Sequence, residues 1–380
     1  MNFDFSSDQY MLRDSVRRYL SDTWGPRKVR AAQGRYSPEL WSGLCELGLQ
    51  TLMVPEAYGG AGLGLIDVSL VFEEFGRSLV PAPMADTILA SHVIDRHGSE
   101  AQRGEWLPLI VSGKGRFALA HVEPGMGYAA EEVQLRARRH EGAWMLEGQK
   151  MLVAGAGVAT HLLVSARDDD GTVRLFVCAA AQPSVAVRAH RAVDQDALLC
   201  EVDFTLALAQ PLGESDGAQA LAYLIDCAAF SSAIQMAGIS SAALELAVDY
   251  AKQRVQFDKP IGSFQAIKHK CADMLVALEG ARSTAYYAAW GLGQEERELA
   301  VSMAKSTAGD ACRLICNDAL QIHGGVGFTW EFDIHLYLKR GKLLEYSFGD
   351  AAFHRERIAS IVLDGHCSRP TTASTVSVTN

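Results

Sequence analysis

Hydrophobic positions in the first part of the chain recur with helical spacing up to about residue 115. An apolar stripe runs from Tyr10 to Leu20 behind Ser6, whose hydroxyl can cap a helix, and Ser37 followed by Pro38 marks the start of another helix. Two more apolar stretches with the same period follow. We therefore expect residues 1–115 to form an N-terminal helical domain.

Beyond Gly115 the period changes from helical to alternating, which is typical of strands. Clusters of Gly, Asp and Pro separate the alternating segments. The expected strands span residues 117–122, 133–139, 144–154, 161–166, 174–179, 185–191 and 199–206. Short strands at such regular spacing predict a small β-barrel or sandwich, which we place at residues 116–212.

From residue 217 the helical period returns and runs to residue 363. The expected helices span residues 221–254, 266–291, 295–323, 334–348 and 351–363. We place a C-terminal four-helix bundle at residues 213–365. Residues 366–380 are rich in Ser and Thr and have no apolar period, so we expect a disordered tail. The fold class is therefore α+β, with a helical domain, a small β domain and a helical bundle in that order.

Composition narrows the class of protein. A chain of 380 residues with 49% hydrophobic and 21% charged residues is globular and has more than one lobe. Its net charge of −10 argues against a nucleic-acid surface. No apolar run is long enough to span a membrane, and the acidic start lacks the features of a signal peptide, so we expect a cytoplasmic protein. The eight cysteines form no Cys-x-x-Cys pair, and we expect no metal site.

Two polar stretches interrupt the helical pattern of the last domain. The segment 254–265 places an arginine three residues before a phenylalanine, and the segment 321–330 contains three glycines in four positions from Gly324. A guanidinium can bind a phosphate, and glycines let successive backbone N–H groups approach a diphosphate. No strand precedes the glycines, so neither a dinucleotide-binding fingerprint nor a P-loop is indicated. Taken alone, the glycines are equally compatible with a plain turn between helices.

Together, the two stretches resemble those of the acyl-CoA dehydrogenase family, and the resemblance covers nearly the whole chain. It implies FAD as cofactor, an acyl-CoA as substrate and an electron-transfer flavoprotein as acceptor. In the family, these stretches hold the FAD diphosphate and adenine across a subunit interface. The cofactor-binding residues that the resemblance implies are Arg254, Phe257, Gln265, Gln321, Gly324 and Gly325.

The catalytic base of the family has no counterpart that we can identify. Family members take a proton from the α carbon with a glutamate, and the resemblance places that position at Phe348 or, in other members, at Ala228. Neither side chain accepts a proton. The nearest carboxylates are Asp226, Glu345 and Asp350, which are weak candidates for the base. We interpret Glu345 and Asp350 as solvated charges at helix ends, so the catalytic residue stays open.

The β domain departs from the family at its flavin contacts. A Thr-Glu-Pro stretch is replaced by His121-Val122 before Glu123-Pro124, and Ala154 stands where a hydroxyl is usual, although Lys150 is kept. Among the histidines, we expect His323 to be structural and His354 to be exposed.

These departures favour a smaller, degenerate subunit of a heteromeric α2β2 enzyme. The run 348–356 resembles the smaller subunits of bacterial enzymes that act on bulky or dicarboxylic thioesters, such as steroid-CoA or pimeloyl-CoA. One alternative is a self-sufficient homo-oligomeric dehydrogenase with a relocated base. Another is a flavin monooxygenase or oxidase on the same fold. The acidic charge disfavours a DNA-binding relative.

Overall fold

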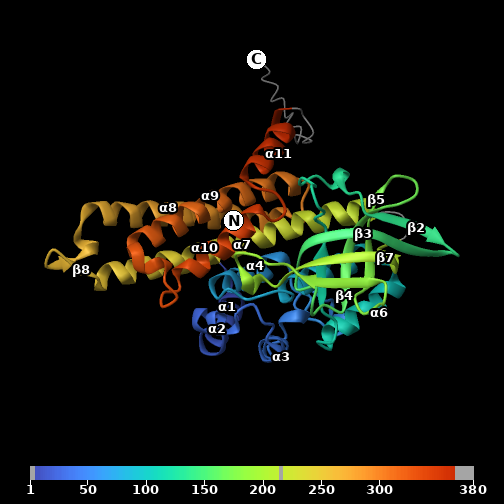
Figure 1. Cartoon of the computed structure of the whole chain (residues 1–380), viewed down its shortest axis with the longest axis horizontal. Coiled ribbons are helices and arrows are strands. Elements are labelled where there is room, and N and C mark those ends of the chain that lie inside the picture. Colours follow the sequence, from blue (N-terminus) through green and yellow to red (C-terminus); the bar gives the residue numbers. More distant parts are fainter. Residues whose placement is uncertain (1–4, 214–216, 364–380) are drawn as a thin grey trace, which may run out of the picture.

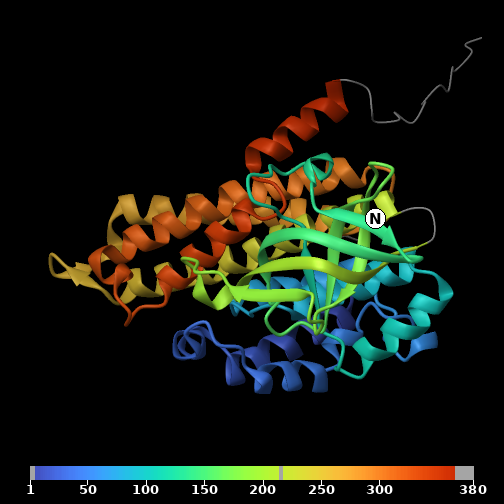
Figure 2. The same cartoon turned by 45° about the vertical axis from the view of Figure 1, so that its right-hand side comes forward.

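The computed structural model describes residues 5–213 and 217–363 of the chain. It has a helical lobe, a β lobe and an elongated helical bundle, in the order expected (Figure 1). The predicted α+β fold class is therefore confirmed. The bundle carries the β lobe near one end, and the N-terminal helices pack below both in the view of Figure 2.

The first and third helices of the N-terminal lobe start where side-chain caps were expected. Ser6 accepts a hydrogen bond from Gln9 N at the start of the first helix, and Ser37 accepts one from Leu40 N. The helices are α1 Ser7–Thr23, α2 Pro26–Ala32, α3 Pro38–Glu46, α4 Leu65–Arg77, α5 Met84–His97 and α6 Glu100–Val111. The pattern had not singled out α2, which is short, or α6, which contains Pro108.

The β lobe contains seven strands, each overlapping one expected from the alternating pattern. They are β1 Phe117–Ala120, β2 Arg136–His140, β3 Ala143–Ala154, β4 His161–Arg167, β5 Val173–Ala179, β6 Val185–Ala189 and β7 Leu199–Pro211. Strands β4, β2, β3, β7 and β5 pair in that order, and β5 pairs back with β4, which closes a ring. The small β-barrel is therefore confirmed. Strand β1 extends it beside β4, and β6 extends it beside β7.

The last lobe is built on α7 Gly217–Gln253, which at about 1.5 Å per residue is about 55 Å long. It packs with α8 Gln265–Gly291, α9 Arg297–His323 and α10 Ile334–Tyr346, while α11 Ala351–Leu363 lies on α9. Helix α7 is long and apolar enough to cross a membrane by composition, but 83% of its most apolar window is buried in the protein. The expected disordered tail lies outside the described residues.

Helices α4 and α7 cross at unusually close range because two glycines face backbone atoms. A Cβ added at Gly76 would lie 2.0 Å from the carbonyl oxygen of Gln235, and one added at Gly238 would lie 1.9 Å from that of Glu73. No real side chain fits at either distance. This crossing sets how the N-terminal lobe sits on the bundle and where Gln235 is placed.

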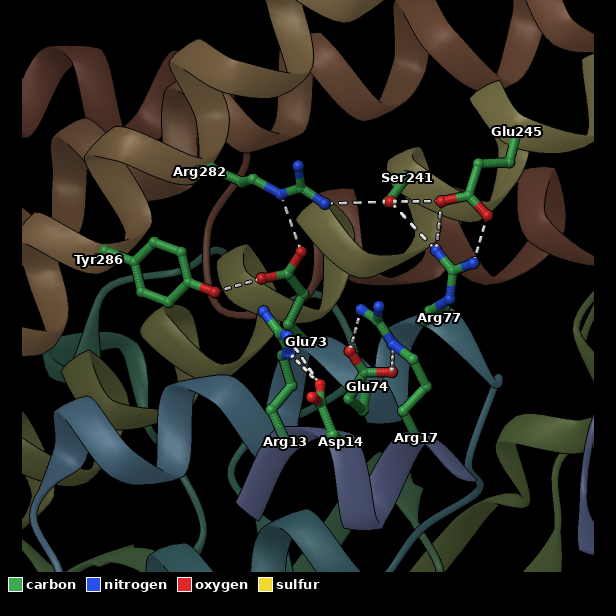
Figure 3. Close-up of polar contacts among 10 residues, drawn as sticks. All are labelled: Arg13, Asp14, Arg17, Glu73, Glu74, Arg77, Ser241, Glu245, Arg282 and Tyr286. Carbon is green, nitrogen blue, oxygen red and sulfur yellow. Dashed lines mark hydrogen bonds and ion pairs between the residues drawn. The ribbon is translucent and has the colours of Figure 1, made fainter. Parts of the chain in front are cut away.

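A network of charged side chains surrounds the same crossing (Figure 3). The buried carboxylate of Glu74 accepts two hydrogen bonds from Arg17 of α1, at 2.6 and 3.0 Å. Its neighbour Glu73 accepts one at 2.9 Å from Arg282 of α8 and another from the hydroxyl of Tyr286. Each of the two adjacent carboxylates therefore has its own positive partner, and together they connect α1, α4 and α8.

Candidate functional site

A cavity of about 520 Å³ lies where α5, the β-barrel, α7 and α10 meet. Its walls are mostly apolar, and they come from all three lobes. The polar residues on the wall are Asp86, His121, Glu123, Tyr128, Ser231, Ser232, Gln235, Tyr346 and Ser347, and the two expected base positions, Ala228 and Phe348, also line it. A largely apolar cavity with few polar groups is typical of a small-molecule site.

Both positions that the resemblance assigns to the catalytic base lie on this cavity. Ala228 belongs to α7, and Phe348 follows the end of α10. A shift of one residue would place the base at Gly349 instead. That position has no room for a carboxylate, since an added Cβ would lie 2.6 Å from His354 Nε2. Ala228 and Phe348 thus lie on the wall of one cavity, and neither side chain accepts a proton.

Two buried basic side chains donate hydrogen bonds to the backbone of the turn that contains Phe348. Lys305 Nζ donates to the carbonyl oxygens of Glu345 at 2.9 Å and Gly349 at 2.6 Å. Its burial lowers the pKa of the ammonium group to about 7. His354 Nε2 donates to the carbonyl oxygen of Phe348 at 3.0 Å. The prediction that His354 is exposed is wrong, because it is 1% exposed and packs on this turn.

Two of the three carboxylates considered as bases are buried and paired. Asp226 Oδ1 accepts a hydrogen bond from Arg357 at 2.7 Å, and its Oδ2 forms an ion pair with Arg297 at 2.7 Å. Glu345 forms ion pairs with Arg313 and Lys342. Neither residue lines the cavity. The interpretation of Glu345 as a solvated charge is wrong, since it is 3% exposed.

The third carboxylate, Asp350, has a structural role at a helix start. It accepts a hydrogen bond from Phe353 N at 2.9 Å and so caps α11. It does not line the cavity either. The carboxylates nearest in sequence to the expected base positions therefore stabilise the fold around the site.

The β-barrel side of the cavity is built on a buried lysine. Lys150 Nζ donates to Glu123 Oε1 at 2.7 Å, to Ser165 Oγ at 2.8 Å and to the carbonyl oxygen of His121 at 2.9 Å. Lys150 and Glu123, which match the family pattern, therefore have a structural role in this wall. Ala154 lies on the same wall and offers no hydroxyl where the family usually has one.

Sequence reasoning missed Asp86 on α5, a cavity carboxylate for which residues 5–213 and 217–363 supply no basic partner. The backbone N–H of Leu119 donates to it, and burial raises its pKa to about 7. A signal existed, because Asp86 is the sole Asp, Glu, Lys or Arg between Arg77 and Asp95. Periodicity alone does not reveal that this helix position faces a cavity.

The residues expected to bind the FAD diphosphate gather at the other end of the bundle. Arg254 follows α7, whose Tyr250 stacks on His323 at the end of α9 with ring centroids 4.5 Å apart. His323 Nδ1 donates to the carbonyl oxygen of Ala319 at 2.7 Å, so its structural role is confirmed. This stacking brings the arginine and glycine stretches together.

The geometry of this bundle end suits an anionic ligand that approaches from outside. Gly324 has φ 65° and ψ −148°, which only glycine adopts readily, and an added Cβ at Gly324 or Gly325 would meet nothing within 4 Å. Phe257 is 85% exposed at the tip of the hairpin formed by β8 Val255–Gln256 and β9 Lys259–Pro260. Arg254, Gln265 and Gln321 are exposed as well. These residues therefore fit the diphosphate half of FAD.

The bundle end is far from the cavity of the same chain. Gln253 lies about 38 Å along α7 from Ala228 at the helical rise of 1.5 Å per residue. Figure 1 shows the β8–β9 hairpin at the end of the bundle opposite the β lobe. A single dinucleotide does not span that length, so the two regions of one chain do not form one cofactor site.

Comparisons with known proteins match nearly the whole chain to one family. Family models of the N-terminal, middle and C-terminal domains of acyl-CoA dehydrogenases match residues 6–114, 118–205 and 215–363. Acyl-CoA dehydrogenase IpdE2 of Mycobacterium tuberculosis is 33% identical, and the match covers 88% of this chain and 90% of that protein.

Solved structures match over similar lengths. A chain of the ChsE4-ChsE5 complex from Mycobacterium tuberculosis has a TM-score of 0.87 and 27% identity, covering 95% of this chain and 99% of that one. A Tcur3481-Tcur3483 steroid acyl-CoA dehydrogenase variant has a TM-score of 0.86 and 30% identity, covering 95% and 99%. The resemblance first seen in the arginine and glycine stretches is thereby confirmed, and the chain belongs to the acyl-CoA dehydrogenase family, whose members are flavoprotein oxidoreductases that act on CH–CH groups.

Proposed function

We propose that this chain is the smaller, non-catalytic subunit of an α2β2 FAD-dependent acyl-CoA dehydrogenase. The observation that carries the proposal is the composition of the cavity. Ala228 and Phe348 occupy the two base positions on its wall, and neither can take the α proton of a thioester. Meanwhile the exposed residues at the far end of the bundle keep the chemistry that a diphosphate requires.

In the proposed complex, this chain supplies contacts to the cofactor and the partner chain supplies the catalytic base. Bound FAD would supply the acceptor for the hydride that leaves the β carbon of the acyl group. In this chain, Arg254 supplies a guanidinium for the diphosphate, and the turn at Gly324 and Gly325 supplies backbone N–H groups. Since these groups lie far from this chain's own cavity, they serve the cofactor of a neighbouring chain. The partner, a homologous subunit, supplies the base.

The substrate of the complex, by this proposal, is a bulky or dicarboxylic acyl-CoA in bacterial catabolism. The match to a steroid acyl-CoA dehydrogenase made of two named chains supports the bulky class. An electron-transfer flavoprotein takes the electrons from the cofactor, as is general in the family. The residues that bind it belong to the assembled enzyme rather than to this chain alone.

Co-expression tests the proposal. The chain is produced alone and together with a homologous chain that has Glu at the position of Phe348. Flavin content is then measured by absorbance after gel filtration. We expect little flavin in the chain alone and stoichiometric flavin in a mixed complex. The matched control replaces the partner's glutamate by glutamine, which should leave flavin content unchanged and abolish bleaching by acyl-CoA. Equal flavin occupancy and bleaching in the chain alone would refute the proposal.

A further inference from the structure

The cavity of this chain carries an ionisable group that has no task in the proposed function, the carboxyl group of Asp86. Asp86 lies in the first turn of α5. Its neighbours on the wall, Leu89 one turn later and Leu119 on β1, are apolar. A carboxyl group in an apolar wall is costly to ionise unless a cation or a polar group of a ligand accompanies it.

The carboxyl group reaches the cavity with at least one of its oxygen atoms. The backbone N–H of Leu119 donates to it, and neither oxygen belongs to the described side-chain atoms that are fully buried and lack a partner. The oxygen that Leu119 does not bind therefore keeps accessible surface. The surrounding protein raises the pKa of Asp86 to about 7, so this surface does not face open solvent. Since Asp86 lines the cavity, the oxygen faces the cavity.

The other ionisable groups on the described wall carry no free charge. Lys150 neutralises Glu123 at a distance of 2.7 Å. Burial and the nearby Lys150 lower the pKa of His121 to about 3, so the imidazole is neutral. Tyr128 and Tyr346 are phenols, which are uncharged near neutral pH.

The helices and strands packed against α5 do not supply a counter-ion either. They are α6, α7, β1 and the short helix η1 Leu49–Thr51. Burial and the N–H of Leu119 account for the pKa of Asp86, with no contribution from a charged side chain among the described residues. Lys and Arg are also absent from the described residues that line the cavity. An ionised Asp86 thus gives the cavity a negative charge that the protein does not compensate.

We propose that Asp86 selects the acyl-CoA bound in this cavity by charge, so that acyl chains that are uncharged or end in a cation are accepted and chains that end in a carboxylate are excluded. A terminal ammonium group would supply the missing counter-ion, whereas a terminal carboxylate would meet a like charge in an apolar environment. For this cavity, the inference therefore removes the dicarboxylic thioesters from the classes named above.

The inference rests on the proposed function only in taking the ligand to be an acyl-CoA. Because Ala228 and Phe348 occupy the base positions, the ligand is held without being dehydrogenated in this chain. Asp86 is thus a specificity-determining residue of a binding site.

Two thioesters with the same chain and opposite end charges test the inference on the full-length protein. Isothermal titration calorimetry compares 6-aminohexanoyl-CoA with pimeloyl-CoA, which have equal numbers of methylene groups, and 8-aminooctanoyl-CoA with azelaoyl-CoA in the same way. We expect the amine to bind at least about tenfold more tightly than the carboxylate at about pH 8 for at least one chain length. Both ligands share the CoA moiety, so its charges cancel in the ratio of affinities.

The pH dependence of this ratio separates Asp86 from the apolar wall. Between about pH 6 and about pH 8 the amine and the carboxylate of the ligands stay ionised, so the effect of an apolar wall on them is constant. The carboxyl group of Asp86 is mostly protonated at the lower pH. The ratio of amine to carboxylate affinity should therefore be at least about threefold smaller at pH 6 than at pH 8.

A matched pair of variants assigns the effect to Asp86. Asp86→Asn keeps the shape of the side chain and removes its charge, so the ratio should fall about tenfold at pH 8 and should no longer change with pH. Asp170→Asn makes the same replacement on an exposed turn and should keep both the ratio and its pH dependence. Circular dichroism checks that each variant is folded, and the pH dependence of the wild-type protein gives a test that needs no variant.

The inference is overturned if the carboxylate binds as tightly as the amine at both chain lengths, or if no thioester binds. It is also overturned if the ratio in the wild-type protein is constant with pH, or if folded Asp86→Asn keeps the wild-type ratio. None of these outcomes depends on flavin content or on a partner chain, so failure here is distinct from failure of the proposed heteromeric assembly.

Discussion

Replacing Asp226 by asparagine separates a structural role from a catalytic one. Asp226 is one of the carboxylates near an expected base position, but its side chain is 1% exposed and lies between two arginines. Asparagine keeps the shape and removes the charge. Arg357 then loses a charge-assisted hydrogen bond of 2.7 Å, and Arg297 loses an ion pair of 2.7 Å.

The expected loss of stability depends on the burial of Asp226, Arg297 and Arg357. Removing one partner of a fully buried ion pair costs about 3–5 kcal/mol. Here the arginine side chains are 23% and 26% exposed, so water solvates part of the charge that is left behind. We therefore expect a loss of about 2–3 kcal/mol in the free energy of unfolding, or a Tm lower by roughly 2–4 °C.

Urea denaturation followed by circular dichroism measures this loss, and Glu298→Gln is the matched control. Glu298 faces the same two arginines at 3.4 and 3.6 Å but is 49% exposed, so we expect a change below about 1 kcal/mol. If Asp226→Asn unfolds at the wild-type urea concentration while acyl-CoA oxidation by the assembled enzyme disappears, the structural assignment is wrong and Asp226 acts in catalysis.

Three further predictions address packing, ionisation and the cofactor. Gly238→Ala should lower stability by about 1–3 kcal/mol in thermal unfolding, since its Cβ would meet the carbonyl oxygen of Glu73, whereas Gly280→Ala has open space and should not destabilise. The pKa of Asp86 in the folded state lies above its usual value, so the wild-type protein should lose stability relative to Asp86→Asn as pH rises from about 4 through 7. Urea titrations should show a loss on the order of 2–4 kcal/mol over this range. A difference between the two proteins that stays constant with pH would contradict the burial argument. Arg254→Ala should weaken FAD binding by the co-expressed complex about tenfold in fluorescence titrations without preventing assembly, and unchanged affinity would remove Arg254 from the cofactor site.

The spacing of apolar residues along the chain was sufficient to predict most of the helices and strands. The strand at 161–167 and the helix α11 were both predicted to within a residue or so, because alternation and helical period are properties of neighbouring residues. Helix α6 was not singled out, since Pro108 and Gly104 obscure its period. The long bundle helices were predicted from the helical period that returns at residue 217.

The site was less predictable because it depends on contacts between distant segments. His354 looks like a surface residue of α11, and only the packing of α9 against the preceding turn buries it. Glu345 is likewise buried, and it pairs with Arg313, which comes from another helix. Asp86 becomes a cavity residue only when α5 lies against β1. Such placements are set by tertiary structure and leave little trace in periodicity.

By the proposed function, this chain completes the flavin site of a partner and lacks a working base of its own. The decisive measurement is the visible absorption spectrum of the purified chain, recorded alone and then after anaerobic addition of mixed acyl-CoAs. We expect no flavin band at about 450 nm for the chain alone and flavin only in the complex with a homologous subunit. About one flavin per chain, bleached by an acyl-CoA, would contradict the claim and would make Asp86 the first residue to test as the base.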